Sequence, residues 1–386
     1  MKMLIHSLYF IFLFVTLAYP QTSEKEDSLI LDFIYQIQNS LNENHPEFLD
    51  NHINLTLMAD RIFIDLTVND EFKKGFLSGI GNSLKLGQQI TTALGEEGHY
   101  TALSYSVNGD TLTAFYRLVG VNGLNYHEYL ILRTGKFEIV DMYTFINGQY
   151  ISEALRQMVE PLILQDDTLL GQLGDLSSRL FGDKRKYLQD IKRIEQIKNQ
   201  QASGHYDKAN QIYESLSENI KHQKVIQLLN IASVYHLDPE LLYKYIDIYR
   251  NDFPDDVSVD LLMIDYFILQ KDYENAIQSI RNFEMISDTD GYLQYLKSNI
   301  YYEMGNEALF IKFAEKCIET EPWLTEPYYS LMDYYLPRKE FGKVIQLMEG
   351  IKENAGIIFE EQTIKEIDIF KGLLNSPEYK KWKSEN

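Results

Sequence analysis

The sequence predicts an α+β domain over residues 27–164, followed by an all-α helical solenoid over residues 187–386 that ends in capping helices. Three observations predict this division. Apolar and polar residues alternate between residues 99 and 146, which is typical of strands, whereas the second half follows the helical period. Helical hairpins recur in that second half at a constant spacing. Residues 165–186 are rich in Gly and Asp, which indicates a linker between the two parts.

Residues 1–18 have the features of a secretory signal peptide. Lys2 precedes an apolar run from Leu8 to Ala18, which is shorter than the roughly 20 residues that span a bilayer. Small residues at Thr16 and Ala18 suit a cleavage site. We therefore expect an exported protein, periplasmic or extracellular, with no stable membrane anchor after cleavage. An uncleaved anchor is the alternative.

Cysteine content and net charge further narrow the class of protein to which this chain can belong. Cys317 is the only cysteine, so no intramolecular disulfide can form, and a large exported protein of this kind is typical of bacteria. We expect Cys317 to face the first helix of its hairpin as a buried, unreactive thiol. The formal net charge of −21 repels phosphate backbones, so we expect no nucleic-acid partner.

The first half begins with helices and continues with strands. Helical spacing of apolar residues extends over 28–41 and 69–94, within a region, 27–96, that is helical in pattern. Asn108-Gly109-Asp110, Asn122-Gly123 and Gly135 are turn signals between the strands that follow. We expect an antiparallel meander with helices on one face, then a helix from Gln149 to Leu164. The four predicted strands are 99–107, 111–121, 126–134 and 136–146. In outline this arrangement resembles the α+β folds of the cystatin or nuclear-transport-factor type, although no motif is shared.

The second half repeats one unit. GHYDKANQIYESL (204–216), KDYENAIQSIRNF (271–283) and KEFGKVIQLMEGI (339–351) each place a loop and an aromatic before a helix. Residues 304–318 form a further copy that lacks the aromatic. The units begin near residues 190, 223, 257, 291 and 325, a period of 33 or 34 residues. That period with two helices per unit is typical of a helical solenoid. Residues 360–374 are expected to cap the array, and a short helix follows Ser376.

Residues 190–358 resemble the tetratricopeptide repeat (TPR) family. The resemblance rests on these residues: Tyr206, Ala209, Pro254, Tyr273, Ala276, Tyr301, Gly305, Pro322, Tyr335 and Phe341. It implies that the small residue after each loop lets the two helices of a pair approach closely. It also implies that the first helix of each pair lines a concave face where ligands lie. Carried onto this chain, that face comprises Leu261, Asp265, Ile268, Tyr292, Tyr295, Asn299, Tyr302, Tyr329 and Asp333.

No motif for catalysis, metal binding or cofactor binding stands out. Gly75, Gly79, Gly81 and Gly87 lie inside a helical pattern, so we interpret them as packing of that helix on the sheet and not as a phosphate loop. The histidines form no HExxH and have no CxxC companion, so we expect no metal site and no cofactor. The strands carry polar residues that could furnish a pocket, although alternation sends some of them to solvent. They are Tyr105, Tyr116, Arg117, His127, Arg133, Asp141 and Tyr143.

The sequence therefore favours an exported, non-enzymatic interaction protein whose aromatic and mildly acidic concave face holds a partner protein or peptide. The alternative is a small-ligand-binding or enzymatic N-terminal domain to which the repeats are an accessory scaffold. A third class, a helical glycan-capture subunit at the outer membrane, is disfavoured because no cysteine follows the signal peptide for lipidation.

Overall fold

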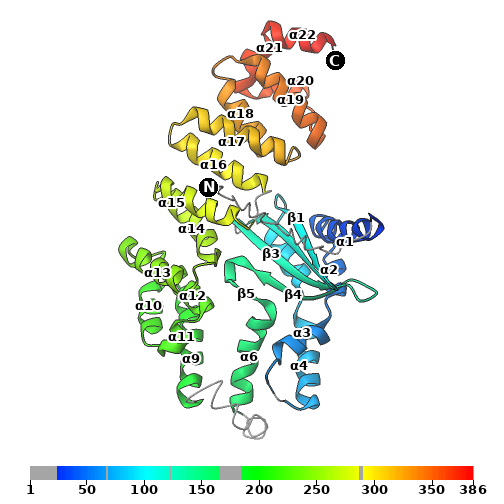
Figure 1. Ribbon diagram of the computed structural model, residues 1–386. Coiled ribbons are helices and arrows are strands. Elements are labelled where there is room, and N and C mark those ends of the chain that lie inside the picture. The colour runs from blue at the N-terminus through cyan, green and yellow to red at the C-terminus, as the bar shows by residue number, and fades with distance from the viewer. Residues whose placement is uncertain (1–23, 67, 122, 166–183, 287–289, 386) are drawn as a thin grey trace, which may run out of the picture.

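The computed structural model describes residues 24–66, 68–121, 123–165, 184–286 and 290–385. The predicted signal peptide, residues 1–18, and most of the predicted linker lie outside these ranges. The described part of the chain is helix-rich and contains an antiparallel sheet in its N-terminal region (Figure 1). None of its helices is long and apolar enough to cross a membrane.

The sheet has five strands in the order β1-β2-β3-β4-β5, and every neighbouring pair is antiparallel. The predicted four-stranded meander is confirmed, and Gly109 and Gly123 take positive φ angles in its turns, as the turn signals require. The prediction missed a fifth, two-residue strand, because Gln149 and Tyr150 pair with β4 before the helix begins. The strands are β1 (His99–Asn108), β2 (Thr111–Gly120), β3 (Gly123–Leu132), β4 (Glu138–Thr144) and β5 (Gln149–Tyr150).

Helices cover one face of this sheet, as predicted. Phe33 and Ile37 of α1 and Ile90 of α5 share a buried core with Tyr116 and Tyr129 of the strands. The long helix predicted over 69–94 is in fact two helices, because the chain turns extended at Leu84. The helices of this half are α1 (Glu24–Asn42), α2 (Glu47–His52), α3 (Leu55–Ile62), α4 (Asp70–Ser83), α5 (Leu86–Leu94), the 3-10 turn η1 (Phe145–Asn147) and α6 (Ile151–Gln165).

The glycines of α4 do not serve the packing that we predicted. α4 packs on α3 through Phe72 and Phe76, whose rings meet Phe63, and not on the sheet. A Cβ atom at Gly75 or Gly79 would meet no other atom within 4 Å. Gly87 of α5 does permit a close approach, because a Cβ atom there would lie 2.4 Å from the carbonyl oxygen of Pro46.

A buried tyrosine–histidine network lies in the same core. The hydroxyl of Tyr100 lies 2.9 Å from Nδ1 of His127 and donates to the hydroxyl of Tyr129. His127 is almost fully buried, and desolvation lowers its pKa to about 4. The neutral imidazole is therefore the form that the folded protein holds at neutral pH.

This histidine predicts a pH dependence of stability. Well above its ordinary pKa of 6.5, His127 is neutral in both states. As pH falls from 6.5 towards 4, mainly the unfolded state takes up the proton, so stability is lost over that window. Between pH 7 and pH 5, we expect the free energy of unfolding of the wild type to fall by about 2 kcal/mol more than that of His127→Gln. Denaturant titrations at both pH values measure this, and equal losses in the two proteins would contradict it.

The second half consists of helical hairpins that follow one another along the chain (Figure 1). Their first helices include α12, α14, α16 and α18, which begin at residues 224, 258, 291 and 326, within one residue of the predicted unit starts. The hairpin helices are α9 (Lys184–Ala202), α10 (Tyr206–Glu214), α12 (Lys224–Val234), α13 (Pro239–Asp252), α14 (Ser258–Leu269), α15 (Tyr273–Glu284), α16 (Gly291–Glu303), α17 (Glu307–Thr320), α18 (Glu326–Tyr335) and α19 (Phe341–Ala355). A single turn, α11 (Glu218–Lys221), joins the first two hairpins.

The hairpin turns share one backbone geometry. Four of the five turns place a residue with positive φ just before the second helix, and the next amide donates to a carbonyl five residues back. The residues with positive φ are Gly204, Lys271, Gly305 and Lys339. The remaining turn, at residues 236–239, differs, because Asp238 caps α13 by accepting from the amide of Glu240.

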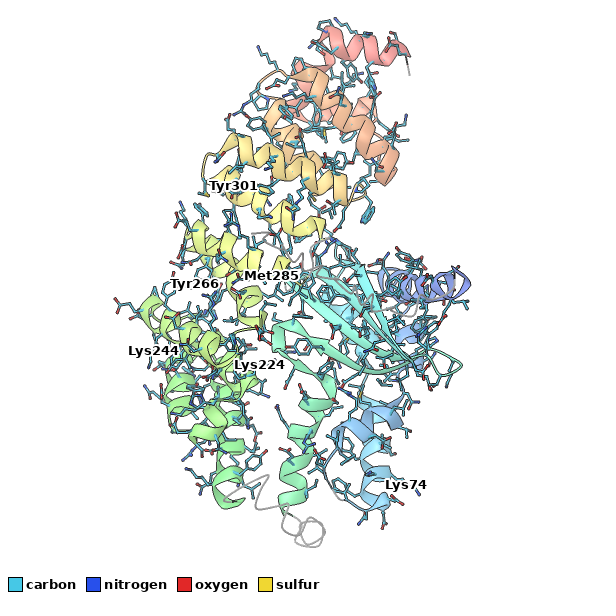
Figure 2. The ribbon with its side chains drawn as sticks, viewed as in Figure 1. Lys74, Lys224, Lys244, Tyr266, Met285 and Tyr301 are labelled. Atoms are coloured by element: carbon cyan, nitrogen blue, oxygen red, sulfur yellow. The ribbon has the colours of Figure 1, made fainter. Side chains whose placement is uncertain are left out.

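Side chains pack between hairpins as the repeat pattern predicts. Ala209 and Ala276 are fully buried where the two helices of a pair meet. Tyr235 packs against Tyr266 of the next hairpin, with 4.8 Å between ring centroids, whereas Tyr301 packs against Phe313 of its own hairpin at 5.3 Å (Figure 2 labels Tyr266 and Tyr301). Cys317 on α17 is fully buried as predicted, and burial raises the pKa of its thiol.

The array ends in short helices. The predicted capping helix over 360–374 is broken, because Ile367 is extended between α20 (Glu361–Glu366) and the turn η2 (Asp368–Phe370). α21 (Lys371–Leu374) and α22 (Pro377–Glu385) follow. As predicted, Ser376 precedes α22, and its hydroxyl accepts from the amide of Tyr379.

Candidate functional site: the junction and the array face

The second face of the sheet is covered by the array, not by solvent. Phe115, Tyr126 and Phe145 belong to the same buried core as the array helices. Phe283 of α15 joins them, with its ring 4.3 Å from that of Tyr126 and 5.5 Å from that of Phe145. The sheet therefore lies between the N-terminal helices and the array, and the two predicted parts share one continuous core. Our expectation of a solvent-exposed second face was wrong.

A buried ionic cluster fixes this junction. Arg117 of β2 is fully buried and donates to Asp290, before α16, and to both oxygens of Glu321, after α17, at 2.7 and 2.8 Å. Tyr126 donates to the second oxygen of Asp290 at 2.5 Å. Burial raises the pKa of Asp290 although the guanidinium acts in the opposite direction. For Glu321 the guanidinium outweighs burial, and the pKa is lowered.

The carboxylates of this cluster also organise the repeat. Asp290 accepts from the amide of Tyr292, and Glu321 accepts from the amide of Gly291, both at the start of α16. The Arg117 guanidinium lies over the ring of Tyr292, 5.1 Å from its centroid. A second polar contact joins β4 to the array, where Tyr143 donates to Asp256 at 3.1 Å. Lys224 donates to both of these residues.

The polar residues of the strands do not form one pocket. Tyr116 and His127 face the helix-covered core, whereas Arg117 and Tyr143 face the array. Asp141 is buried and accepts from Arg61 at 2.6 Å and from the hydroxyl of Ser152 at 2.5 Å. The remaining two lie elsewhere: Arg133 donates to Glu26 and Gly109, and Tyr105 packs at the margin of the helix-covered core. In the described part of the chain, no group of three or more His, Cys, Asp or Glu residues is arranged to hold a metal ion.

The junction also determines which residues of the predicted concave face are accessible. Of its three residues on α14, Leu261 is buried in the core and Ile268 is half-buried. Asp265 is exposed, and its carboxylate lies beside Gly123 in the β2–β3 turn, where partial desolvation raises its pKa. The part of the predicted face on α14 is therefore adjacent to the sheet.

The later residues of the predicted face are more accessible. On α16, Tyr292 and Tyr295 are half-buried with ring centroids 5.7 Å apart, and Asn299 is half-buried. Tyr302 is 56% exposed. On α18, Tyr329 is 39% exposed and Asp333 is exposed. We call the set formed by Tyr295, Asn299, Tyr302, Tyr329 and Asp333 the array face.

The structure adds a groove that the sequence did not predict. It has a volume of about 870 Å³ and lies between α6 and the first helices α9 and α12, with a mainly apolar lining. At one end Tyr187 of α9 donates to Glu160 of α6 at 2.6 Å. We call it the α6–α9 groove. Its lining includes Ala154, Gln157, Ile191, Ile194, Lys198, Val225, Leu228, Leu229, Ala232 and Leu262.

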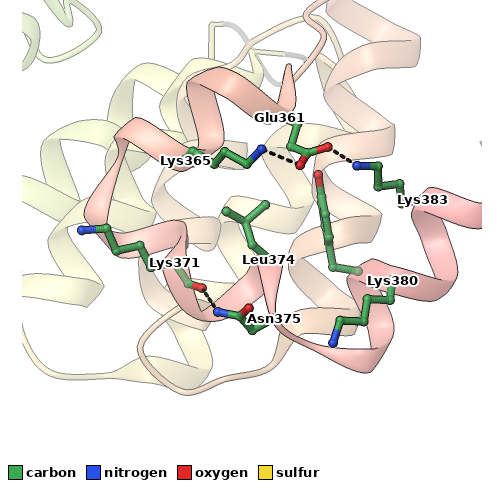
Figure 3. Close-up of a pocket in the computed structure, with 8 residues that line it drawn as sticks. Glu361, Lys365, Lys371, Leu374, Asn375, Lys380 and Lys383 are labelled. Carbon is green, nitrogen blue, oxygen red and sulfur yellow. Dashed lines mark hydrogen bonds and ion pairs between the residues drawn. The ribbon is translucent and has the colours of Figure 1, made fainter.

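A further hollow of about 510 Å³ lies among the terminal helices and is lined by four lysines (Figure 3). Three of these lysines already pair with carboxylates of the chain. Glu361 binds Lys365 and Lys383, and Asp368 binds Lys371 at 2.5 Å. The Glu361–Lys383 pair joins α20 to α22, and the Asp368–Lys371 pair joins η2 to α21, so we interpret the hollow as part of the structural cap.

Comparison with known proteins gives little further guidance. No protein-family model matches the chain, and no curated protein matches it either. Among solved structures, a chain titled MamA MSR-1 C2 matches 44% of this chain and 96% of its own length, with 12% identity and a TM-score of 0.33. A MamA mutant matches 43% of this chain and 97% of its own, with 12% identity and a TM-score of 0.32. At this level neither supports an argument about fold or function.

Proposed function

We propose that the chain is an exported, non-enzymatic interaction protein whose residues 184–385 form a TPR-like array that holds a partner protein or peptide. Two features support the repeat assignment: the hairpins start at the predicted spacing, and four of their turns share one backbone geometry. The proposal of export rests on the sequence of residues 1–18, and the net charge of −21 disfavours nucleic acid as a partner.

The observation that carries the proposal is the exposure of large aromatic side chains on successive first helices. Tyr302 of α16 and Tyr329 of α18 are both exposed, and Tyr295, also on α16, is half-buried. Aromatic side chains of this kind are frequent anchors at protein interfaces. On the adjacent α14, Leu261 is buried and Ile268 is half-buried, so apart from Asp265 the accessible part of the predicted surface is the array face.

The test removes two equivalent anchors. Tyr295 and Tyr329 lie one repeat apart, and each well-buried anchor contributes about 2 kcal/mol or more to affinity, roughly thirtyfold. The double variant Tyr295→Ala with Tyr329→Ala is therefore expected to abolish recovery of the partner from envelope extract by the full-length protein. Far-UV circular dichroism should stay close to that of the wild type.

The matched control replaces two half-buried tyrosines on second helices, Tyr206→Ala with Tyr273→Ala. This control should lose stability and keep the partner. Equal loss of the partner in both double variants would contradict a specific role for the array face, and retention of the partner by Tyr295→Ala with Tyr329→Ala would exclude it.

A second candidate function is favoured by the α6–α9 groove. A mainly apolar cleft of about 870 Å³ with a few polar groups has the size and lining of a small-molecule site. Native mass spectrometry of the purified full-length protein tests it. A bound small molecule that is lost in Leu229→Gln, but kept in the double tyrosine variant, would favour this candidate over partner binding.

A further inference from the structure

A second cleft opens where the sheet meets the array. It has a volume of about 530 Å³ and lies between α1, strand β1 and the loop that leads into α18. Tyr35 of α1 and Trp323 of the loop contribute aromatic side chains that are 49% and 53% exposed. We call it the junction cleft. Its remaining lining residues are Gln38, Asn42, Glu97, His99, Tyr100, Thr101, Ala102, Leu324, Thr325 and Glu326.

The charges of the junction cleft have one sign. Its lining includes two carboxylates, Glu97 and Glu326, and no Lys or Arg. Within the described ranges neither carboxylate forms an ion pair. Burial and the nearby Arg117 lower the pKa of His99, so the imidazole is neutral at pH 7. Arg117 lies behind Thr101, to which it donates at 3.3 Å, and its charge is already compensated by Asp290 and Glu321.

The floor of the cleft cannot readily accept another strand. β1 is an edge strand, and the outward amides of Tyr100 and Ala102 already donate to side chains of α1. Asn42 accepts from the amide of Tyr100 at 2.7 Å, and Gln38 accepts from the amide of Ala102 at 2.8 Å. Asn42 also donates to the carbonyl of Tyr100 at 2.9 Å. An occupant would therefore be recognised through the aromatic side chains and carboxylates of the walls and not through strand pairing.

We propose that the junction cleft binds a Lys or Arg side chain of the partner protein. Aromatic side chains attract cations through the negative faces of their rings, and the two carboxylates complement the same charge. The net charge of −21 concentrates cations near the surface as a whole.

The junction cleft is continuous with the array face, so we infer that the cation belongs to the protein segment bound there. Glu326 is the first residue of α18, the helix that carries Tyr329. His99 of the cleft packs against Tyr292, which in turn packs against Tyr295. A segment anchored on the array face therefore reaches the cleft directly. The inference rests on the proposed function and adds a basic residue to the description of the partner.

The probe is a tetralysine peptide with a fluorescent label, titrated into the full-length protein at low ionic strength and followed by anisotropy. Glu97→Gln with Glu326→Gln is expected to weaken binding about tenfold. The matched variant Asp247→Asn with Glu274→Gln makes the same change in net charge at exposed positions of α13 and α15, and should weaken binding less than about twofold. Equal weakening in both would show attraction by net charge alone and overturn the proposal.

A second readout reports the cleft itself. The chain has two tryptophans, so in Trp382→Phe the emission arises from Trp323 alone. Tetralysine should shift that emission, whereas a tetraglutamate peptide should not. Unchanged emission at saturating tetralysine would also overturn the proposal.

These outcomes are separable from those of the proposed function. If tetralysine fails these tests while the double tyrosine variant loses the partner, the proposal for the junction cleft is wrong and the proposed function stands. If tetralysine binds in the cleft while that variant keeps the partner, the array face is excluded and the cleft remains.

Discussion

Replacing Arg117 by methionine is expected to lower the free energy of unfolding by about 3–5 kcal/mol, because breaking a buried ion pair leaves an uncompensated charge. Asp290 and Glu321 would then face each other across the buried junction without a cation. Chemical denaturation followed by far-UV circular dichroism measures the loss. A loss below about 1 kcal/mol would contradict the role assigned to this cluster.

The matched control removes the charges that the arginine compensates. The triple variant Arg117→Met with Asp290→Asn and Glu321→Gln retains side chains of similar size and leaves no carboxylate in this cluster. We expect it to recover much of the stability lost by Arg117→Met, since neutral replacement of a whole buried ionic group is often tolerated. If the triple variant is less stable than Arg117→Met, the hydrogen bonds at the start of α16 matter more than the charges.

Phe283→Ala is expected to lower the free energy of unfolding by about 3–5 kcal/mol, the usual cost of removing a buried phenylalanine. The ring is fully buried between the sheet and α15, in contact with Tyr126 and Phe145. Because Phe283 belongs to the array and both of these neighbours belong to the N-terminal half, a cavity there should weaken the junction itself. Phe283→Leu should cost much less, because it keeps most of the buried volume.

The experiment also reports whether the two parts unfold together. Tryptophan emission, which arises from Trp323 and Trp382, and far-UV circular dichroism should give coincident transitions in the wild type and in Phe283→Ala. Two separated transitions in the wild type would contradict a shared core, whereas separation confined to the variant would show that Phe283 couples the parts.

Much of the fold could be predicted because it depends on local patterns. Gly109 and Gly123 mark turns that need positive φ, and the strands between them follow from alternation. The hairpin starts follow from the 33- or 34-residue period. The break at Leu84 could not be predicted in this way, because apolar spacing continues through it from α4 to α5. Its cause lies in packing, since α4 contacts α3 and α5 contacts the sheet.

The junction depends on packing between segments far apart in the sequence. The run Phe115-Tyr116-Arg117-Leu118-Val119 is nearly all buried, and this continuous run was the available signal that β2 is covered on both faces. The charge of Arg117 within such a run indicated a buried partner of opposite charge, but no sequence pattern identified Asp290 or Glu321 as that partner. The α6–α9 groove and the junction cleft could not be predicted for the same reason: each is formed by elements from both halves.

Site-specific photocrosslinking tests the central claim, that a partner binds the array face, most directly. A photoreactive phenylalanine analogue is placed in the full-length protein at Tyr302, at Ile194 in the α6–α9 groove, or at Lys244, which is exposed on α13 (Figure 2). If the partner binds the array face, we expect a discrete crosslinked partner from position 302 and none from positions 194 and 244. A crosslink from position 194 alone, or the same products from all three positions, would contradict it.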